Sequence, residues 1–255
     1  MSLTKSYEGV RHVVVDNFGG GSITVEPGSR PDFVEASIDA PDEKFGGQVE
    51  IRHEHDWLRI SFPQFPWHVK GHLRLAVPHG LTFVIKTGSA DISISADIGS
   101  SKIISGSGDI TIGNAVDLDC STGSGNISVG RVDGNGARLS SGSGDVSIAE
   151  ANCPITAKSG SGEVVVKSVR GASLKANSGS GNIAVSATSG SVDLRSASGS
   201  LAVGVADNLP VWLDLSSVSG DIRIGLESTN QPEPGEPYIT LRARTASGDV
   251  AVFRA

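Results

Sequence analysis

Sulfur and long apolar runs are scarce in this 255-residue sequence. It has two cysteines and one methionine, and its longest apolar stretch is four residues, at 250–253. Two cysteines exclude a disulfide scaffold. Runs this short exclude a membrane-spanning helix, which needs about 20 apolar residues, and the apolar core of a signal peptide, which needs about 7–15. We therefore expect a folded cytoplasmic protein that does not insert into a membrane.

Positive charge is also in the minority. Lys and Arg number 21 against 28 Asp and Glu, which gives a formal net charge of −7. Proteins that bind nucleic acids usually show a basic patch or stripe, so we predict no nucleic-acid partner. The carboxylates are scattered along the chain, which excludes an acidic disordered tail.

A repeat of about eighteen residues fills the last two thirds of the chain. Its copies include SGSGDITI, TGSGNISV, SGSGDVSI, SGSGEVVV and SGSGNIAV. When the second glycine is numbered zero, positions +2 and +4 are Ile, Val or Leu in all nine copies, and positions −7 and −5 are mostly apolar. Two short segments of period two in each copy predict two strands per repeat.

The two apolar segments of a repeat have opposite parity relative to the glycine. Because a continuous strand cannot change face, the chain must turn a corner within S-G-S-G and a second corner before the next repeat. We predict an all-β parallel β-solenoid of about nine rungs. Residues 81–255 form the rungs and residues 1–80 form an N-terminal β cap, continuous with them in one elongated domain. The rival fold is an antiparallel meander of hairpins.

The glycine corner is the most regular part of the repeat. Position −1 is serine in all nine copies, and position −3 is serine or threonine in all nine. We expect these hydroxyls to bind backbone groups of the turn, and the glycine to provide positive φ or a close backbone approach. The acidic or amide column at +1 favours Asx-bonded turns over calcium sites. The predicted structural corner is Gly108, Gly125, Gly144, Gly162, Gly181, Gly199, Gly220 and Gly248, with Ala90 in the first copy.

The two ends of the repeat array differ. Residues 1–80 still alternate like strands, and Asn17–Val25 is a degenerate copy of the corner and strand. These strands are expected to cover the first edge, because an open edge recruits other chains. At the other end the chain stops at 253–255, directly after the last repeat. We expect an uncapped C-terminal edge there, open to homo-oligomer formation.

Catalytic and metal-binding patterns are sparse. His53 and His55 are candidate metal ligands, with a third ligand from His68 or His72. The other interpretation is that this segment is the polar tip of a hairpin. The sequence has no nucleophile elbow, phosphate loop or C-x-x-C motif, and its outward columns show no carboxylate pair of the kind that glycosidases use. We predict no catalytic residue, no cofactor and no enzymatic activity.

Three stretches carry a family resemblance. They are the repeated [ST]-G-S-G-[DN]-[IV]-x-[IV], the entry HLRLAVPHGLTFVIKTGSADISI, and the exit VWLDLSSVSGDIRIGLE with YITLRARTASGDVAVFRA. Over about residues 72–255 the chain resembles the DUF4097 family of adhesin-like bacterial β-repeat proteins. The resemblance implies a stacked β-repeat fold related to toastrack domains, some of which are linked with cell-envelope stress. It implies no catalytic residues.

We predict a non-catalytic interaction scaffold for an unidentified protein partner. The alternative is a carbohydrate-active or carbohydrate-binding β-helix protein. The longest insertion, 227–237, holds three glutamates and three prolines and should project from the rungs. Nearby Trp212 either faces outward, where exposed aromatics often form binding hot spots, or folds back over the solenoid end. The predicted partner edge is Trp212, Glu227, Glu233 and Glu236.

Overall fold

The computed structural model describes residues 2–39, 48–63, 70–187, 189–207, 209–227 and 238–254. The chain forms two compact units, residues 1–129 and 130–255. Every regular element in the described ranges is a β-strand, which confirms the predicted all-β class.

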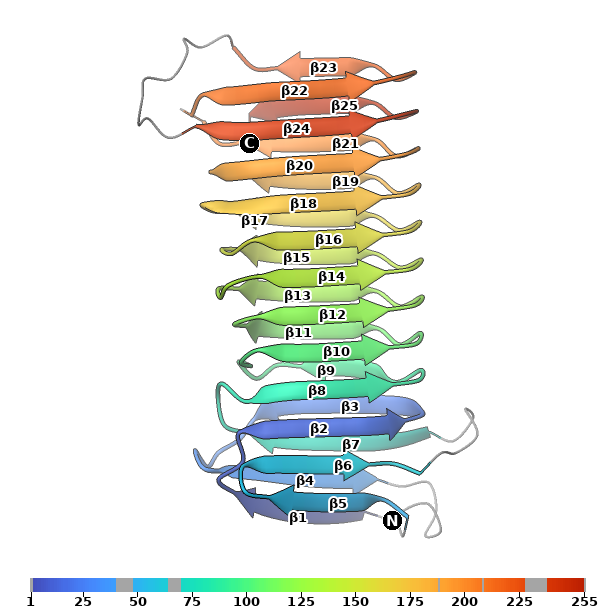
Figure 1. Cartoon of the computed structure of the whole chain (residues 1–255), viewed down its shortest axis with the longest axis vertical. Helices are drawn as coiled ribbons and strands as arrows, with labels where there is room; N and C mark the ends of the chain where they lie inside the picture. Colours follow the sequence, from blue (N-terminus) through green and yellow to red (C-terminus); the bar gives the residue numbers. More distant parts are fainter. Residues whose placement is uncertain are drawn as a thin grey trace. The chain divides into compact units, whose positions relative to one another are not determined.

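The first unit contains two facing sheets (Figure 1). Its strands are β1 (Ser2–Glu8), β2 (His12–Phe18), β3 (Gly20–Pro27), β4 (Phe33–Asp39), β5 (Glu50–Glu54), β6 (Trp57–Ser61), β7 (Lys70–Val77), β8 (Thr82–Thr87), β9 (Asp91–Ile94), β10 (Ser101–Ser105), β11 (Ile110–Ala115) and β12 (Leu118–Thr122). Within this unit the strand orders are β1-β4-β7-β3-β9-β11 and β5-β6-β2-β8-β10-β12.

Successive repeats pair in parallel and in register. Ile103 of β10 lies beside Ile85 of β8 on one side and Cys120 of β12 on the other. All three side chains are fully buried. Equivalent residues thus stack along a ladder, and the prediction of a parallel β-solenoid is confirmed over the antiparallel meander.

The segment 1–80 contributes two further parallel rungs to the ladder and also the strands that cover the ladder's end. The degenerate copy Asn17–Val25 joins β2 to β3, and these strands pair in parallel with β8 and β9. A second rung, β6 with β7, pairs in parallel with β2 and β3. Beyond it β5, β4 and β1 are antiparallel to their neighbours. This end is therefore covered by antiparallel strands, which break the repeat of the ladder.

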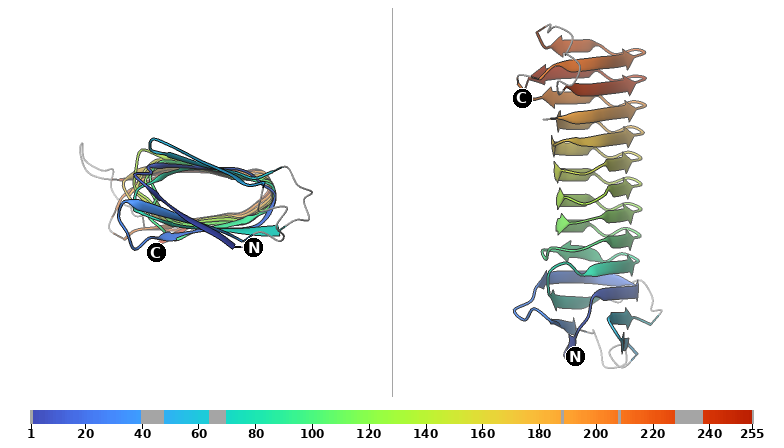
Figure 2. Two further views of the ribbon diagram at one scale, coloured as in Figure 1. Left: turned by 90° about the horizontal axis from the view of Figure 1, so that it is seen from below. Right: turned by 60° about the vertical axis from the view of Figure 1, so that its left-hand side comes forward.

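The second unit repeats the two-strand rung. Its strands are β14 (Ala137–Ser141), β15 (Val146–Ala151), β16 (Ile155–Ser159), β17 (Val164–Val169), β18 (Ala172–Ser178), β19 (Ile183–Ala187), β20 (Gly190–Ser196), β21 (Leu201–Val205), β22 (Val211–Ser217), β23 (Ile222–Gly225), β24 (Ile239–Thr245) and β25 (Val250–Arg254), while β13 (Ile127–Val132) spans the unit boundary. Each rung is a flattened coil of two facing strands (Figure 2, left).

The last rung in the sequence is not the last rung in space. Strand β24 pairs with β20 and β22, and β25 pairs with β21 and β23 (Figure 1, red strands between orange ones). This order is possible because every rung has aliphatic residues at the equivalent inward positions. Leu241, for example, lies beside Val192 on one side and Leu213 on the other. The prediction that 253–255 form the uncapped edge is wrong. Among the described strands, β22 and β23 are outermost in this unit.

The interior is apolar and includes both cysteines. Cys120 and Cys153 are both buried, and Cys120 occupies the inward −5 column of its repeat. Burial, with a smaller effect from neighbouring Asp119, raises the pKa of the Cys120 thiol to about 12. The thiol is therefore neutral and held as a small apolar side chain.

Candidate functional site

The hydroxyl at position −3 joins consecutive rungs. The Ser159 Oγ accepts a hydrogen bond from the Gly162 N–H at 2.9 Å and donates one to the Gly144 carbonyl at 2.9 Å. Ser159 is only 6% exposed. The column therefore serves the backbone of the corner. The same pair of bonds is made by Thr122, Ser178, Ser196 and Ser217.

The corner glycine is required by a close backbone approach. A Cβ added at Gly162 would lie 2.2 Å from the Gly144 oxygen and 2.4 Å from its carbonyl carbon. The φ of Gly162 is outside the left-handed region. Of the two explanations that the sequence leaves open, the structure selects close packing of one rung on the next.

The acidic column at +1 also binds backbone. The Asp145 carboxylate accepts the Glu163 N–H at 2.8 Å, and Asp91 accepts the Asp109 N–H at 3.0 Å. Each carboxylate therefore reaches the equivalent residue of the next rung rather than its own turn. This role accounts for the amide replacement at Asn182, whose Oδ1 accepts the Ser200 N–H at 2.9 Å.

The histidine cluster forms a hairpin tip. His53 lies opposite Leu58 in the antiparallel pair β5–β6, and His55 occupies the turn with φ of 55°. The His53 ring contacts Tyr7 edge to face, with centroids 5.6 Å apart. Within the described ranges no three His, Cys, Asp or Glu side chains come close enough to hold a metal. His68 lies outside these ranges.

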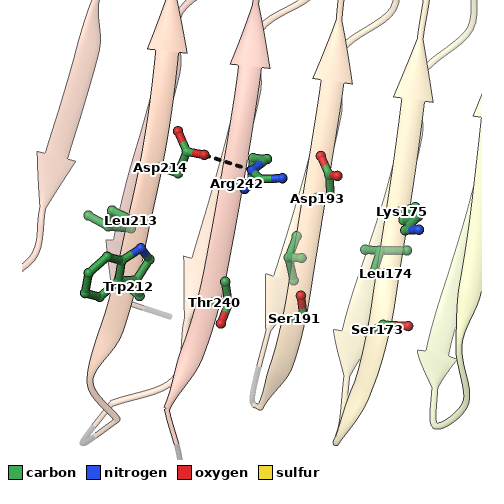
Figure 3. A pocket seen from close by; sticks show the side chains of 11 residues that line it. Ser173, Leu174, Lys175, Ser191, Asp193, Trp212, Leu213, Asp214, Thr240 and Arg242 are labelled. Carbon is green, nitrogen blue, oxygen red and sulfur yellow. Dashed lines mark hydrogen bonds and ion pairs between the residues drawn. The ribbon is translucent and has the colours of Figure 1, made fainter. Parts of the chain in front are cut away.

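A shallow groove of about 570 Å³ lies on the outer face of the second unit, at the β22 end (Figure 3). Two lines of in-register residues form it. One runs from Trp212 through Thr240 and Ser191 to Ser173, and the other comprises Asp214, Arg242, Asp193 and Lys175. Trp212 is 63% exposed on this face.

The charged line of the groove is held by ion pairs. Asp214 accepts hydrogen bonds from Arg242 Nε at 2.8 Å and Arg244 Nη2 at 3.0 Å. These two guanidinium groups lower the pKa of Asp214 below its ordinary value. Asp193 pairs with Arg195 at 3.2 Å. The carboxylates thus fix the orientation of three arginines on the surface.

Cations outnumber anions on this surface, which we call the basic face. It is the outer face of β14, β16, β18, β20, β24 and β22, at positions −6 and −4 of each repeat. Most of its charged side chains are exposed. The absence of a carboxylate pair in these columns does not reveal the excess of cations, which becomes apparent only when charges are counted column by column. The charged residues are Arg138, Lys158, Lys175, Arg195, Arg242 and Arg244, with Asp193 and Asp214.

The repeated corner and the stacked parallel rungs match one known family along most of the chain. The family model of Toastrack DUF4097 matches residues 35–253. The chain belongs to the DUF4097 Toastrack family. The resemblance predicted from the repeat motifs is thereby confirmed. No curated protein matches the sequence.

Solved structures share the Toastrack fold over almost the whole chain. A "putative lipid binding protein" from Parabacteroides distasonis ATCC 8503 has a TM-score of 0.55 at 15% identity, covering 98% of this chain and 96% of its own. A "putative adhesin" from Bacteroides fragilis NCTC 9343 has a TM-score of 0.52 at 15% identity, covering 99% and 97%. At this identity the likeness shows the fold alone.

The predicted partner edge of this Toastrack chain is described only in part. Trp212 lines the groove, and Glu227 is exposed just after β23. Glu233 and Glu236 lie outside the described residues. In the described part of the chain no helix has the length and apolar character that crossing a bilayer requires.

Proposed function

We propose that this Toastrack chain is a non-catalytic interaction scaffold that binds an acidic segment of a partner protein on its basic face. The observation that carries the proposal is the gathering of six cations on one sheet face, beside exposed Trp212, in a chain of net charge −7. A local excess of cations against that background attracts and orients an anionic partner.

The geometry of the arginines supports carboxylate recognition. Arg195 and Arg244 are in-register neighbours on β20 and β24, so their backbones are about 4.8 Å apart. Guanidinium groups bind carboxylates through two parallel hydrogen bonds, and clusters of arginine recur in the recognition of acidic motifs. Trp212 adds an apolar contact at one end of the face. Because charged side chains rather than apolar ones dominate this face, we favour a peptide over a membrane surface.

The groove chemistry supports binding without catalysis. Carboxylate catalysis of glycoside cleavage needs one acid with a raised pKa beside an ionised partner. Here arginines lower the pKa of Asp214, and Asp193 is also paired with an arginine. The names of two proteins with this fold, a "putative adhesin" and a "putative lipid binding protein", also support a binding role. The cytoplasmic location and the link with envelope stress stay predictions.

The test is titration of a fluorescent Glu-rich peptide with matched charge-reversal variants. The test variants are Arg244→Glu and Lys175→Glu, which change residues of the basic face. The control is Lys167→Glu, because Lys167 is exposed on β17 of the opposite sheet. We expect each basic-face variant to weaken binding about tenfold or more, since hydrogen bonds to charged groups contribute about 1.5–3 kcal/mol. The control should bind like the unchanged chain, and added salt should weaken all binding.

Three results would overturn the proposal. The first is no peptide binding at low salt, and the second is an equal loss in Lys167→Glu. The third is binding to phosphatidylcholine vesicles containing phosphatidylglycerol without binding to the peptide, which would assign the face to an anionic membrane surface. Circular dichroism of each variant shows whether its strands are retained.

A further inference from the structure

At the β22 and β23 end of the second unit, inward-facing apolar residues are partly exposed. Ile222 and Ile224 are 43% and 52% exposed, whereas Ile183 in the equivalent column is fully buried. In the described structure β22 pairs only with β24, and β23 only with β25. One edge of each strand therefore has backbone N–H and C=O groups without a strand partner.

The end strands of the first unit are built differently. Strand β5 carries Glu50, Arg52 and Glu54, all exposed, and β1 includes exposed Lys5. Charged side chains on an end strand are a usual means by which proteins prevent edge-to-edge association. The β22–β23 end lacks this protection on its inward line, where Leu213, Leu215, Ile222 and Ile224 follow the ladder pattern.

We propose that this open end binds the same end of a second copy of the chain, with β22 and β23 each pairing antiparallel to its counterpart about a twofold axis. Leu215 and Ile222 lie equally far from the middle of the corner at 217–220. A twofold axis normal to the two sheets that lies between Leu215 and its copy on one sheet therefore also lies between Ile222 and its copy on the other. Inward residues then meet inward residues on both sheets, which continues the core across the junction.

The outward side chains fit this register. It sets Asp221 opposite Arg223 of the second copy, and Arg223 opposite Asp221. Both side chains are more than 70% exposed. It also brings Val218, 84% exposed, to Trp212 of the second copy. Moving the axis by one residue would instead place Arg223 opposite itself and Asp214 opposite itself. Like charges directly opposite are destabilising.

The size of the end predicts a weak dimer. Seven residues of β22 span about 23 Å, and two sheets about 10 Å apart with their outer side chains are roughly 20 Å thick. The contact is thus roughly 450 Å² per copy, less than the 800 Å² or so of a standard interface. Antiparallel backbone hydrogen bonds add to it. We expect a micromolar dissociation constant.

Sedimentation velocity of the full chain, from low to several hundred micromolar, tests the proposal with a charge-swap design. Asp221→Arg and Arg223→Asp each place like charges together and should be monomeric. Their equimolar mixture restores opposite charges at both positions and should dimerise like the unchanged chain. Arg74→Glu is the control, because Arg74 belongs to the first unit, where it pairs with Glu26, and is not part of β22 or β23.

A second variant tests the apolar line. Ile224→Lys adds a charge at a solvent-exposed edge position, so the chain should fold, and dimerisation should weaken more than tenfold. A chain that stays monomeric at every concentration would overturn the proposal. So would a dimer that Ile224→Lys leaves intact, or a mixture of the two charge variants that stays monomeric.

Discussion

Replacing Ser159 by alanine tests whether the hydroxyl column holds the rungs together. The substitution removes one acceptor and one donor at once, because Ser159 Oγ bonds both the Gly162 N–H and the Gly144 carbonyl at 2.9 Å. Both backbone groups belong to a tightly packed corner in which Ser159 is 6% exposed. A methyl group there leaves two buried polar groups without these bonds.

The magnitude follows from those two groups. A buried donor or acceptor that loses its partner costs about 1–3 kcal/mol. Two such groups, with some access of water to the corner, should lower the free energy of unfolding by about 2–4 kcal/mol. For a chain of this size 1 kcal/mol corresponds to about 2–4 °C in Tm. We therefore expect Tm to fall by roughly 5–15 °C.

Thermal and urea unfolding followed by circular dichroism measure this loss. The matched control is Ser161→Ala, two residues away at the exposed −1 position, which should change stability by less than about 0.5 kcal/mol. Ser159→Thr should retain most of the stability, because threonine occupies the same column at Thr122 and makes both bonds there. Equal stability of the Ser159→Ala and Ser161→Ala chains would refute the structural role of the column.

Three further predictions follow from burial. Ile110→Asp should unfold neighbouring rungs, because Ile110 is fully buried and an unpaired buried charge costs several kcal/mol, whereas Thr111→Asp on the exposed side of the same strand should melt like the unchanged chain. Gly162→Ala should destabilise strongly in a urea titration, while Gly113→Ala, whose added Cβ finds its nearest atom at 3.6 Å, should not. The Cys120 thiol should react with a disulfide reagent only after unfolding. Its folded pKa of about 12 exceeds the ordinary 9.0, so its contribution to stability is complete below pH 9 and is lost as pH rises toward 12; native-state reaction at pH 8 would contradict this.

The repeat columns predicted the rung but not the order of the rungs. Columns at −7, −5, +2 and +4 specify which side chains face inward, and the structure buries Leu194, Leu201 and Val203 accordingly. Because all rungs share these columns, the columns do not predict which rungs are adjacent in space. Because Leu241 packs as well beside Val192 as beside Leu213, nothing in the columns indicates that β24 lies between β20 and β22.

The candidate site was less predictable, since its charges come from different repeats. Lys175, Arg195 and Arg244 are separated by 20 and 49 residues in the sequence. They share a face only because rungs stack in register and β24 sits beside β20. Trp212 is recognisable in the sequence because it has the parity of outward-facing residues. Its neighbours in the groove, Thr240 and Arg242, depend on the rung order that the sequence does not indicate.

The displaced last rung also constrains how the molecule is assembled during synthesis. A solenoid whose rungs follow the sequence can grow by adding each new rung to the previous one as the chain leaves the ribosome. Here β22 and β23 are made before β24 and β25, the strands on which they finally rest. Until residues 239–254 emerge, the exposed edges of β20 and β21 are equally good templates for β22 and β23, because the inward columns are equivalent. Completion of this end therefore requires either a delay or the release of a mispaired rung. That step should appear as a slow refolding phase that is absent when the chain ends at Glu227.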